Sequence, residues 1–497
     1  MRELLRAVAK TVVGSFAALL MGTVAVKTIA LFIGPEGVGL FSLLRQTQQV
    51  AIVLAMVNGQ NALVQGIACR EGEERARYIS VAFWIVLVLA AVVLIVFATM
   101  PGEITRWLLG RSDPSARGAF RLLSLSILFG VVSAFSVGIL NGHGMVGRAS
   151  LIQFTNYLVI ALLTYPLVVG IVGASSSLAG AFGWLLVAGT GAAAVVAVSI
   201  VWRARLLRVH APTWTAESAG AARHFLTLSS GLLISGVVAV AVPLAVRSLV
   251  IRGFDLEGAG IFDAAWTLSM SYVLIVLTSF SSYYLPTLSG LHHPEARREL
   301  IARVLRVAII LMLPLVTMVI VFKPLVITLL YSREFTPSLS IMRWMLIGDY
   351  FKVMSWVFSY TMLAYADLKM FIGTEVIWGT LTLAAAVFSV RVLHSLEALG
   401  FTFALLTMSY FLVMARYVAK RHGFRFGRQA VLQSGAGLAV IVVASMITWT
   451  DTVVRWPVAI ASVAAATGTS WMLLTTEERR AVRHRLVSRS RKQSERL

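Results

Sequence analysis

The sequence has little charge for its length, and the charge it has is mostly positive. Only 13% of the 497 residues are charged, whereas 58% are hydrophobic, and 43 Lys and Arg outnumber 22 Asp and Glu. A soluble core formed by a chain of this length could not bury so much apolar surface. A soluble globular protein is therefore excluded, and an integral membrane protein is expected.

Cysteine is almost absent, and the motifs of common enzymes are missing. The single cysteine, Cys69, excludes an intramolecular disulfide and a metal cluster built on thiolates. The eight His are scattered, and we find no HExxH, GxSxG, glycine-rich phosphate loop with its Lys, or DxD-like acid pair. We therefore predict no catalytic residue, no metal site and no cofactor, and we expect a transporter rather than an enzyme.

Long apolar runs make up most of the chain. Each run approaches the roughly 20 residues that a helix needs to cross the hydrocarbon core. The short alternating segments of a membrane barrel do not occur. The sequence predicts an all-α protein with about fourteen spans. They lie near 11–33, 40–66, 79–100, 118–141, 150–171, 177–202, 225–250, 260–286, 304–323, 338–363, 370–393, 396–418, 430–449 and 456–475.

Lys and Arg gather in alternate loops. Counting the two sets of loops, roughly three times as many lie on the side of both termini as on the opposite side, so both termini are expected to be cytoplasmic. The positive excess is then mainly a signal of topology. The basic tail at 477–497 is expected to lie against anionic membrane lipids rather than nucleic acid.

An internal repeat divides the chain. The stretch from Gly14 to Gln49 resembles the stretch from Gly231 to Trp266: each has a cation inside its first apolar run, and EGVGLF at 36–41 corresponds to EGAGIF at 257–262. Parallel repeats are one architecture of secondary transporters, with the substrate between the halves. We therefore expect four parts: a six-helix bundle at 1–210, a second at 211–420, an extra helix pair at 421–476, and the tail at 477–497.

Five cations lie inside predicted spans; besides Arg343 and Lys352, three are candidates for binding an anion: Lys27, Arg45 and Arg247. Such a charge is costly unless it faces protein, water or a partner, so each is a functional hypothesis. None has an equally deep acidic partner in its own predicted helix, which favours a positive cavity for phosphate, pyrophosphate or sugar carboxylates. Two alternatives stay open: Lys27 could extend to the interface, and Arg247 could be an interfacial anchor paired with Asp255 or Glu257.

Four further residues are candidates for the cavity or for coupling to an ion: Gln49, Asp263, Asp349 and Lys352. Gln49 belongs to an amide-rich span that either lines a wet cavity or packs inside the bundle. Asp263 could pair with Arg247 across the turn of the repeat. Asp349 precedes Lys352 by one helical turn, so the two could neutralise each other or form an ion or proton site.

A family resemblance rests on LLYSREFTPSLSIMRWMLIGDYFKVMSWVFSYTMLAYADLKMFIGTE at 329–375. This stretch, with GPEGVGLF near the start and SSYYLPTLS at 281–289, is similar to Wzx-type O-antigen and enterobacterial-common-antigen flippases. These form the polysaccharide transporter branch of the MOP superfamily. The similar motifs are LYS-x-EF from Leu330, W-x-x-x-GD from Trp344 and K-x-x-x-W from Lys352.

The resemblance implies a fold and a function. The fold would be a V-shaped, pseudo-twofold pair of six-helix bundles around a cationic cavity, extended here by two C-terminal helices. The function would be alternating-access transfer of a polyprenyl-pyrophosphate-linked O-antigen or exopolysaccharide unit from the cytoplasmic to the periplasmic leaflet of the bacterial inner membrane. The resemblance also implies that Lys27, Arg45 and Arg247 engage the lipid head group. It implies a monomer that works with a glycan polymerase and a chain-length regulator.

Two other functions remain as alternatives. A cation-coupled multidrug antiporter of the same superfamily would need deep carboxylates, whereas the deep charges here are mostly positive. A membrane glycan polymerase or ligase would need a sizeable outward loop, and 101–117 is short. The role of the last helix pair is left open.

Overall fold

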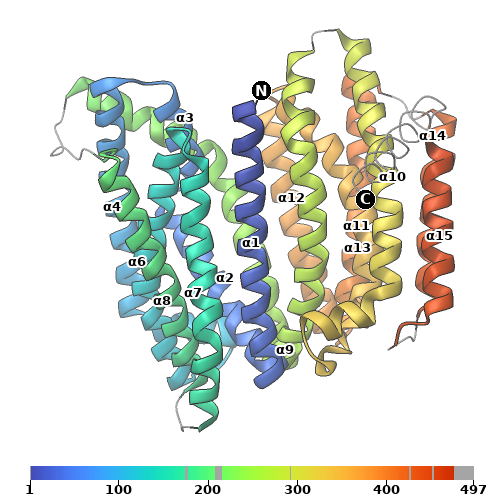
Figure 1. Cartoon of the computed structure of the whole chain (residues 1–497), viewed down its shortest axis with the longest axis horizontal. Coiled ribbons are helices and arrows are strands. Elements are labelled where there is room, and N and C mark those ends of the chain that lie inside the picture. Colours follow the sequence, from blue (N-terminus) through green and yellow to red (C-terminus); the bar gives the residue numbers. More distant parts are fainter. Residues whose placement is uncertain are drawn as a thin grey trace, which may run out of the picture. The chain divides into compact units, whose positions relative to one another are not determined.

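The computed structural model describes residues 2–173, 177–207, 215–291, 293–424, 427–449 and 453–474, and these residues form helices joined by short turns. The predicted basic tail at 477–497 lies outside this part of the chain. The helices, shown in Figure 1, are α1 Arg2–Phe32, α2 Pro35–Ala55, α3 Gln60–Ala68, α4 Gly72–Thr99, α5 Pro101–Leu109, α6 Pro114–Gly142, α7 Val146–Gly173, α8 Leu178–Arg203, α9 Ala216–Gly290, α10 Pro294–Leu330, η1 Arg333–Phe335, α11 Ser338–Ala364, α12 Leu368–Val387, η2 Phe388–Val392, α13 Leu396–His422, α14 Arg428–Ile447 and α15 Trp456–Leu473.

The predicted all-α membrane fold is confirmed. The predicted spans other than 40–66 fall on helical segments, and in the described part of the chain nine helices are long and apolar enough to cross a membrane. Two predicted spans are the halves of α9, which bends at Phe254 and Asp255. Asp255 has a φ of 60°, and its carboxylate accepts hydrogen bonds from the backbone N–H groups of Glu257 and Gly258. This carboxylate thus caps the second half of α9.

The predicted continuous span at 40–66 is wrong in one respect, because the helix is broken between α2 and α3. Val57 and Asn58 at the break have φ values of 51° and 52°, which a continuous α-helix cannot contain. The break packs against the first half of α9, where a Cβ on Gly236 would lie 2.3 Å from Asn58 Nδ2. Tertiary packing of this kind leaves no mark on hydropathy. The loop at 101–117, predicted to face outward, also contains a helix, α5, which the sequence did not predict.

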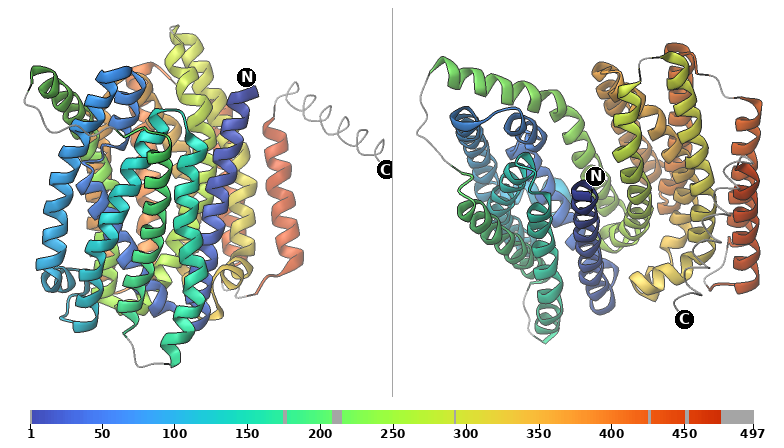
Figure 2. Two further views of the ribbon diagram at one scale, coloured as in Figure 1. Left: turned by 60° about the vertical axis from the view of Figure 1, so that its left-hand side comes forward. Right: turned by 45° about the horizontal axis from the view of Figure 1, so that its top comes forward.

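The chain packs into two compact units that interleave along the sequence. Unit 1 comprises Met1–Asp263, Leu330–Phe335 and Thr374–His394, and unit 2 comprises the rest. In unit 1, α6 packs against α8, and α7 packs against α1 and α8; Figure 2 shows these helices from two sides. In unit 2, α11 packs against α13, and α14 against α15. The division at residues 210, 420 and 476 stays a prediction.

The two copies of the repeat meet in unit 1 at a close crossing of backbones. A Cβ on Gly39, near the start of α2, would lie 2.2 Å from the carbonyl oxygen of Leu256 on α9. A Cβ on Gly260 would lie 1.9 Å from the carbonyl oxygen of Pro35. Because glycine has no Cβ, it allows backbones to approach this closely. The second of the two glycines shared by EGVGLF and EGAGIF is therefore explained by a reciprocal contact between the two copies of the repeat.

Gly260→Ala should destabilise the protein, because its methyl group would overlap the backbone of α2 and overpacking costs about 1–3 kcal/mol or more. We expect a lower midpoint of thermal unfolding for the purified protein in detergent. The control is Gly231→Ala, also on α9, where a Cβ would meet nothing within 4 Å. Equal midpoints for the two variants would contradict the crossing.

Candidate functional site

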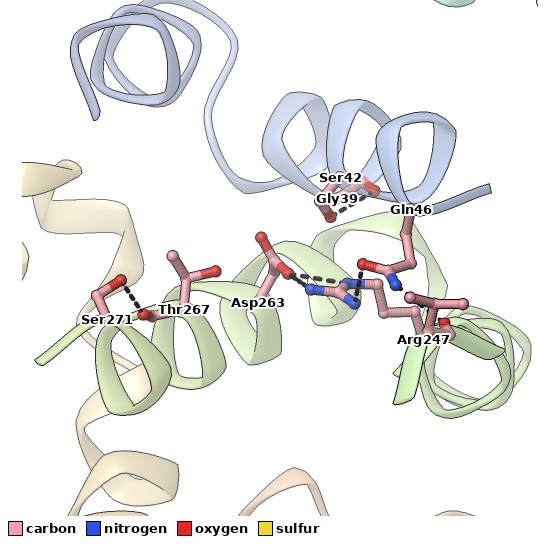
Figure 3. A network of polar contacts seen from close by, with 8 residues as sticks. Gly39, Ser42, Gln46, Arg247, Asp263, Thr267 and Ser271 are labelled. Atoms are coloured by element: carbon pink, nitrogen blue, oxygen red, sulfur yellow. Dashed lines mark hydrogen bonds and ion pairs between the residues drawn. The ribbon is translucent and has the colours of Figure 1, made fainter. Parts of the chain in front are cut away.

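A buried ion pair joins the two halves of α9 within unit 1. The side chains of Arg247 and Asp263 are 6% and 5% exposed. The Arg247 Nε donates to Asp263 Oδ1 at 2.8 Å, and Nη2 contacts the same oxygen (Figure 3). The bend at Phe254 and Asp255 turns the chain back, so that residues 16 positions apart meet. This is the pairing that the sequence left open.

Gln46 on α2 completes the cluster. Its Oε1 accepts a long hydrogen bond of 3.4 Å from Arg247 Nη1, and its Nε2 donates to the carbonyl of Val240 at 2.9 Å (Figure 3). The amide is therefore held by α9 on both sides. The edge of the guanidinium formed by Nε and Nη2 is occupied by Asp263, whereas the edge at Nη1 faces the neutral amide of Gln46. An anion could replace Gln46 at this edge without breaking the ion pair.

The pair changes the charge expected here. Asp263 neutralises Arg247 locally, so Arg247 adds less positive charge than its predicted span alone implied. A buried pair is costly to desolvate, and removing one partner leaves an uncompensated charge. Asp263 therefore fixes the position of the guanidinium and lowers its attraction for a distant anion.

Lys27 and Arg45 have different surroundings in unit 1. Lys27 is half-buried on α1, and its Nζ donates to the carbonyl of Tyr331, which follows α10. Lys27 therefore contacts the backbone just beyond the end of α10. Arg45 is half-buried on α2, with its guanidinium 5.9 Å from the centre of the Phe41 ring. Arg45 forms no ion pair with an acidic side chain in the described ranges.

The predicted polar residue Gln49 is exposed, whereas its neighbour Gln48 is buried. Gln48 Nε2 donates to the hydroxyl of Ser126 on α6, which in turn lies 3.1 Å from the hydroxyl of Thr190 on α8. The amide-rich helix is thus satisfied partly by packing. The structure brings Arg247, Asp263 and Gln46 together, and gives Lys27, Arg45 and Gln49 separate environments.

A second cluster lies within unit 2, around the fully buried Asp349 on α11. Its carboxylate accepts hydrogen bonds from Ser269 Oγ at 2.8 Å and from the Tyr272 hydroxyl at 2.6 Å. Lys352 is one turn away, but its Nζ lies 2.8 Å from the sulfur of Met270 and 5.5 Å from the centre of the Phe403 ring. Among the described residues, Asp349 and Lys352 are not in ion-pair contact. Two hydroxyls from α9 therefore stabilise the carboxylate directly.

Sequence reasoning missed Ser269 and Tyr272. They lie one helical turn apart on one face of α9, and two polar residues at that spacing in an apolar span were the available signal. It also missed Lys323, which is 1% exposed and donates from Nζ to the carbonyl of Thr448 at 2.8 Å. Thr448 is the C-terminal cap of α14, so a buried cation of α10 holds the last helical hairpin.

Comparisons of the sequence with known proteins give a polysaccharide biosynthesis family and two lipid III flippases. Residues 28–340 match the profile of a family described as polysaccharide biosynthesis protein. The chain is 27% identical over 388 residues to the lipid III flippase of Escherichia coli K12, a match that covers 76% of this chain and 88% of that protein. The lipid III flippase of Shigella flexneri gives the same values.

Comparisons of the structure agree on the fold. An inward closed structure of the lipid II flippase MurJ matches with a TM-score of 0.68 at 14% identity, covering 93% of this chain and 97% of that one. An inward-facing MATE-family multidrug resistance transporter of the MOP superfamily matches with a TM-score of 0.67 at 15% identity, covering 83% and 98%. At such low identities the structural similarity establishes the MOP fold. It does not identify the molecule that is transported.

Asp263→Leu should destabilise the protein by about 3–5 kcal/mol, because it leaves Arg247 buried without a partner. The double variant Arg247→Met with Asp263→Leu should recover most of this loss, because no charge then remains buried. Thermal unfolding of wild type, both single variants and the double variant gives the coupling energy. Additive effects of the two substitutions would show that the pair contributes no coupling.

Proposed function

The chain belongs to the polysaccharide biosynthesis protein family, and we propose that this multi-pass membrane transporter is a flippase for a polyprenyl-pyrophosphate-linked oligosaccharide, acting by alternating access. The observation on which the proposal depends is the similarity to the lipid III flippase over 88% of that protein's length. The MOP fold supports it, since a lipid II flippase shares that fold. The transported molecule has a strongly anionic head group joined to an apolar tail, so a binding site needs fixed cations beside membrane-facing apolar surface.

We assign the pyrophosphate to Lys27, Arg45 and Arg247. Arg45 is suited to attract the head group because no acidic side chain of the described residues neutralises it. Arg247 offers the edge that now faces Gln46, and this edge can form a charge-assisted hydrogen bond with a phosphate oxygen. Lys27 can exchange the carbonyl of Tyr331 for a stronger acceptor. The three contacts differ in geometry, and Arg and Lys are not interchangeable among them.

The cellular setting is proposed from the sequence. The concentration of Lys and Arg in alternate loops supports both termini in the cytoplasm, and the bacterial relatives support the inner membrane of a bacterium. Transport would then run from the cytoplasmic to the periplasmic leaflet. An O-antigen or exopolysaccharide unit is the proposed cargo, and a glycan polymerase and a chain-length regulator are the proposed partners.

The cluster in unit 2 is the proposed coupling site. Asp349 is fully buried and is stabilised by two hydroxyl donors, while Lys352 lies one turn away without pairing to it. A buried carboxylate in a transporter helix can exchange a proton or a small cation and thereby favour one conformation. The same carboxylate is the observation that favours the second candidate, a cation-coupled multidrug antiporter, which would bind its cargo there.

Replacing Arg45 or Lys27 with Ala should slow transport of the lipid-linked oligosaccharide about tenfold or more, because a contact to the pyrophosphate is lost. The measurement is the rate at which a labelled lipid-linked oligosaccharide becomes accessible in the opposite leaflet of proteoliposomes. Arg148→Ala is the control for charge, because Arg148 is exposed next to a turn. Undiminished transport by both Lys27→Ala and Arg45→Ala would refute the assignment of the head group.

Asp349→Asn should remove the dependence of transport on an ion gradient while the unfolding midpoint stays near that of the wild type. One of the two hydroxyls of Ser269 and Tyr272 can still donate to the amide oxygen, and the other can turn to accept from the amide NH2 group. The assay applies proton and sodium gradients separately across the same proteoliposomes. Asp367→Asn is the matched control, since Asp367 also accepts a hydrogen bond from a tyrosine, Tyr417, but lies at a helix end. An unchanged gradient dependence would argue against coupling at Asp349.

A further inference from the structure

A groove of about 820 Å³ opens on unit 1 between α4, α6 and α8, away from the residues assigned to transport. Such a volume is within the range of small-molecule sites. Its lining is apolar except at one end, and no lining residue comes from α1, α2 or α9. The floor is formed by buried side chains such as Val86, Val131 and Phe135, and the open edges by exposed ones such as Leu87 and Val198.

The groove is shorter than one leaflet is thick. From Leu128 to Ser136 it extends along α6 for about 12 Å at 1.5 Å per residue. That is less than half of the hydrocarbon core, which is about 30 Å thick. At its polar end stands Trp202, 78% exposed, which is the position that Trp favours at a membrane interface. The groove therefore follows the path of an acyl chain from the interface toward the bilayer centre.

Two cations mark the same end. Arg203 ends α8, Arg205 follows it, and both are exposed and line the groove. Neither forms an ion pair with an acidic residue in the described part of the chain. Among the acids near the neighbouring helix ends, Glu74 pairs with Arg70 and Glu217 with Arg77, while the exposed Glu71 and Glu73 at the start of α4 form no ion pair with Arg203 or Arg205. The arginines are thus available to an outside anion at the depth of lipid head groups.

We propose that this groove is a binding site for one anionic phospholipid, with an acyl chain along α4, α6 and α8 and the phosphate at Arg203 and Arg205. An apolar slot capped by two fixed cations is complementary to a lipid that has both an acyl chain and a net negative charge. A zwitterionic lipid matches the slot but not the arginines. The site is separate from the clusters at Arg247 and Asp349, so the proposal does not depend on the proposed function.

The test uses the purified full-length protein and native mass spectrometry with phosphatidylglycerol and phosphatidylethanolamine. Wild type should retain phosphatidylglycerol preferentially. Arg203→Gln with Arg205→Gln should weaken that binding on the order of tenfold or more, because each interfacial cation contributes to anionic lipid binding. The charge-matched control is Arg416→Gln with Lys420→Gln on α13, where both side chains are exposed but do not line the groove.

A second variant keeps the charges and fills the groove. Val198→Trp, at an exposed edge, should weaken phosphatidylglycerol binding as well, with an unfolding midpoint like that of the wild type. Equal retention of both lipids by wild type would overturn the proposal, as would equal effects of the two double variants. Displacement of phosphatidylglycerol by a polyprenyl phosphate at similar concentration would also overturn it, because the groove would then accept the tail of the transported lipid.

Discussion

The structure depends on one constraint: a charge placed at membrane depth must find its partner inside the protein. Arg247 meets this requirement through Asp263, Lys27 through the carbonyl of Tyr331, and Lys323 through the carbonyl of Thr448. Each contact joins segments that are distant in sequence or separated by a bend. Because leaving such a charge unpaired costs several kcal/mol, these contacts fix how the helices align around them.

The helices could be predicted from the sequence, because each membrane-spanning helix needs about 20 apolar residues and such runs can be recognised from local composition. The cations Lys27, Arg45 and Arg247 were also found locally, since each interrupts an apolar run. Their partners were not, with the exception of Asp263, which lies close to Arg247 in sequence. Ser269 and Tyr272 contact Asp349 some 80 positions away, and a pairing at that distance is decided by tertiary packing.

The internal repeat illustrates the same division. The similarity of EGVGLF to EGAGIF can be seen in the sequence, but its physical reason, a backbone contact between the two motif-bearing helices, can be seen only in the structure. Gly39 faces the backbone at Leu256, and Gly260 faces the backbone at Pro35, so each copy supplies the space that the other requires. Hydropathy also could not show the break at Val57 and Asn58, because the residues on both sides of it are suited to a continuous helix.

The link from Lys323 to Thr448 bears on how the last two helices are attached. The buried ammonium group of α10 donates to both the carbonyl and the hydroxyl of Thr448, so the end of α14 supplies acceptors to a charge inside unit 2. The ring of Trp449 next to Thr448 also lies 4.1 Å from the guanidinium carbon of Arg343, which gives the hairpin a second cation on the bundle. The C-terminal helices α14 and α15 are therefore part of the packing of unit 2.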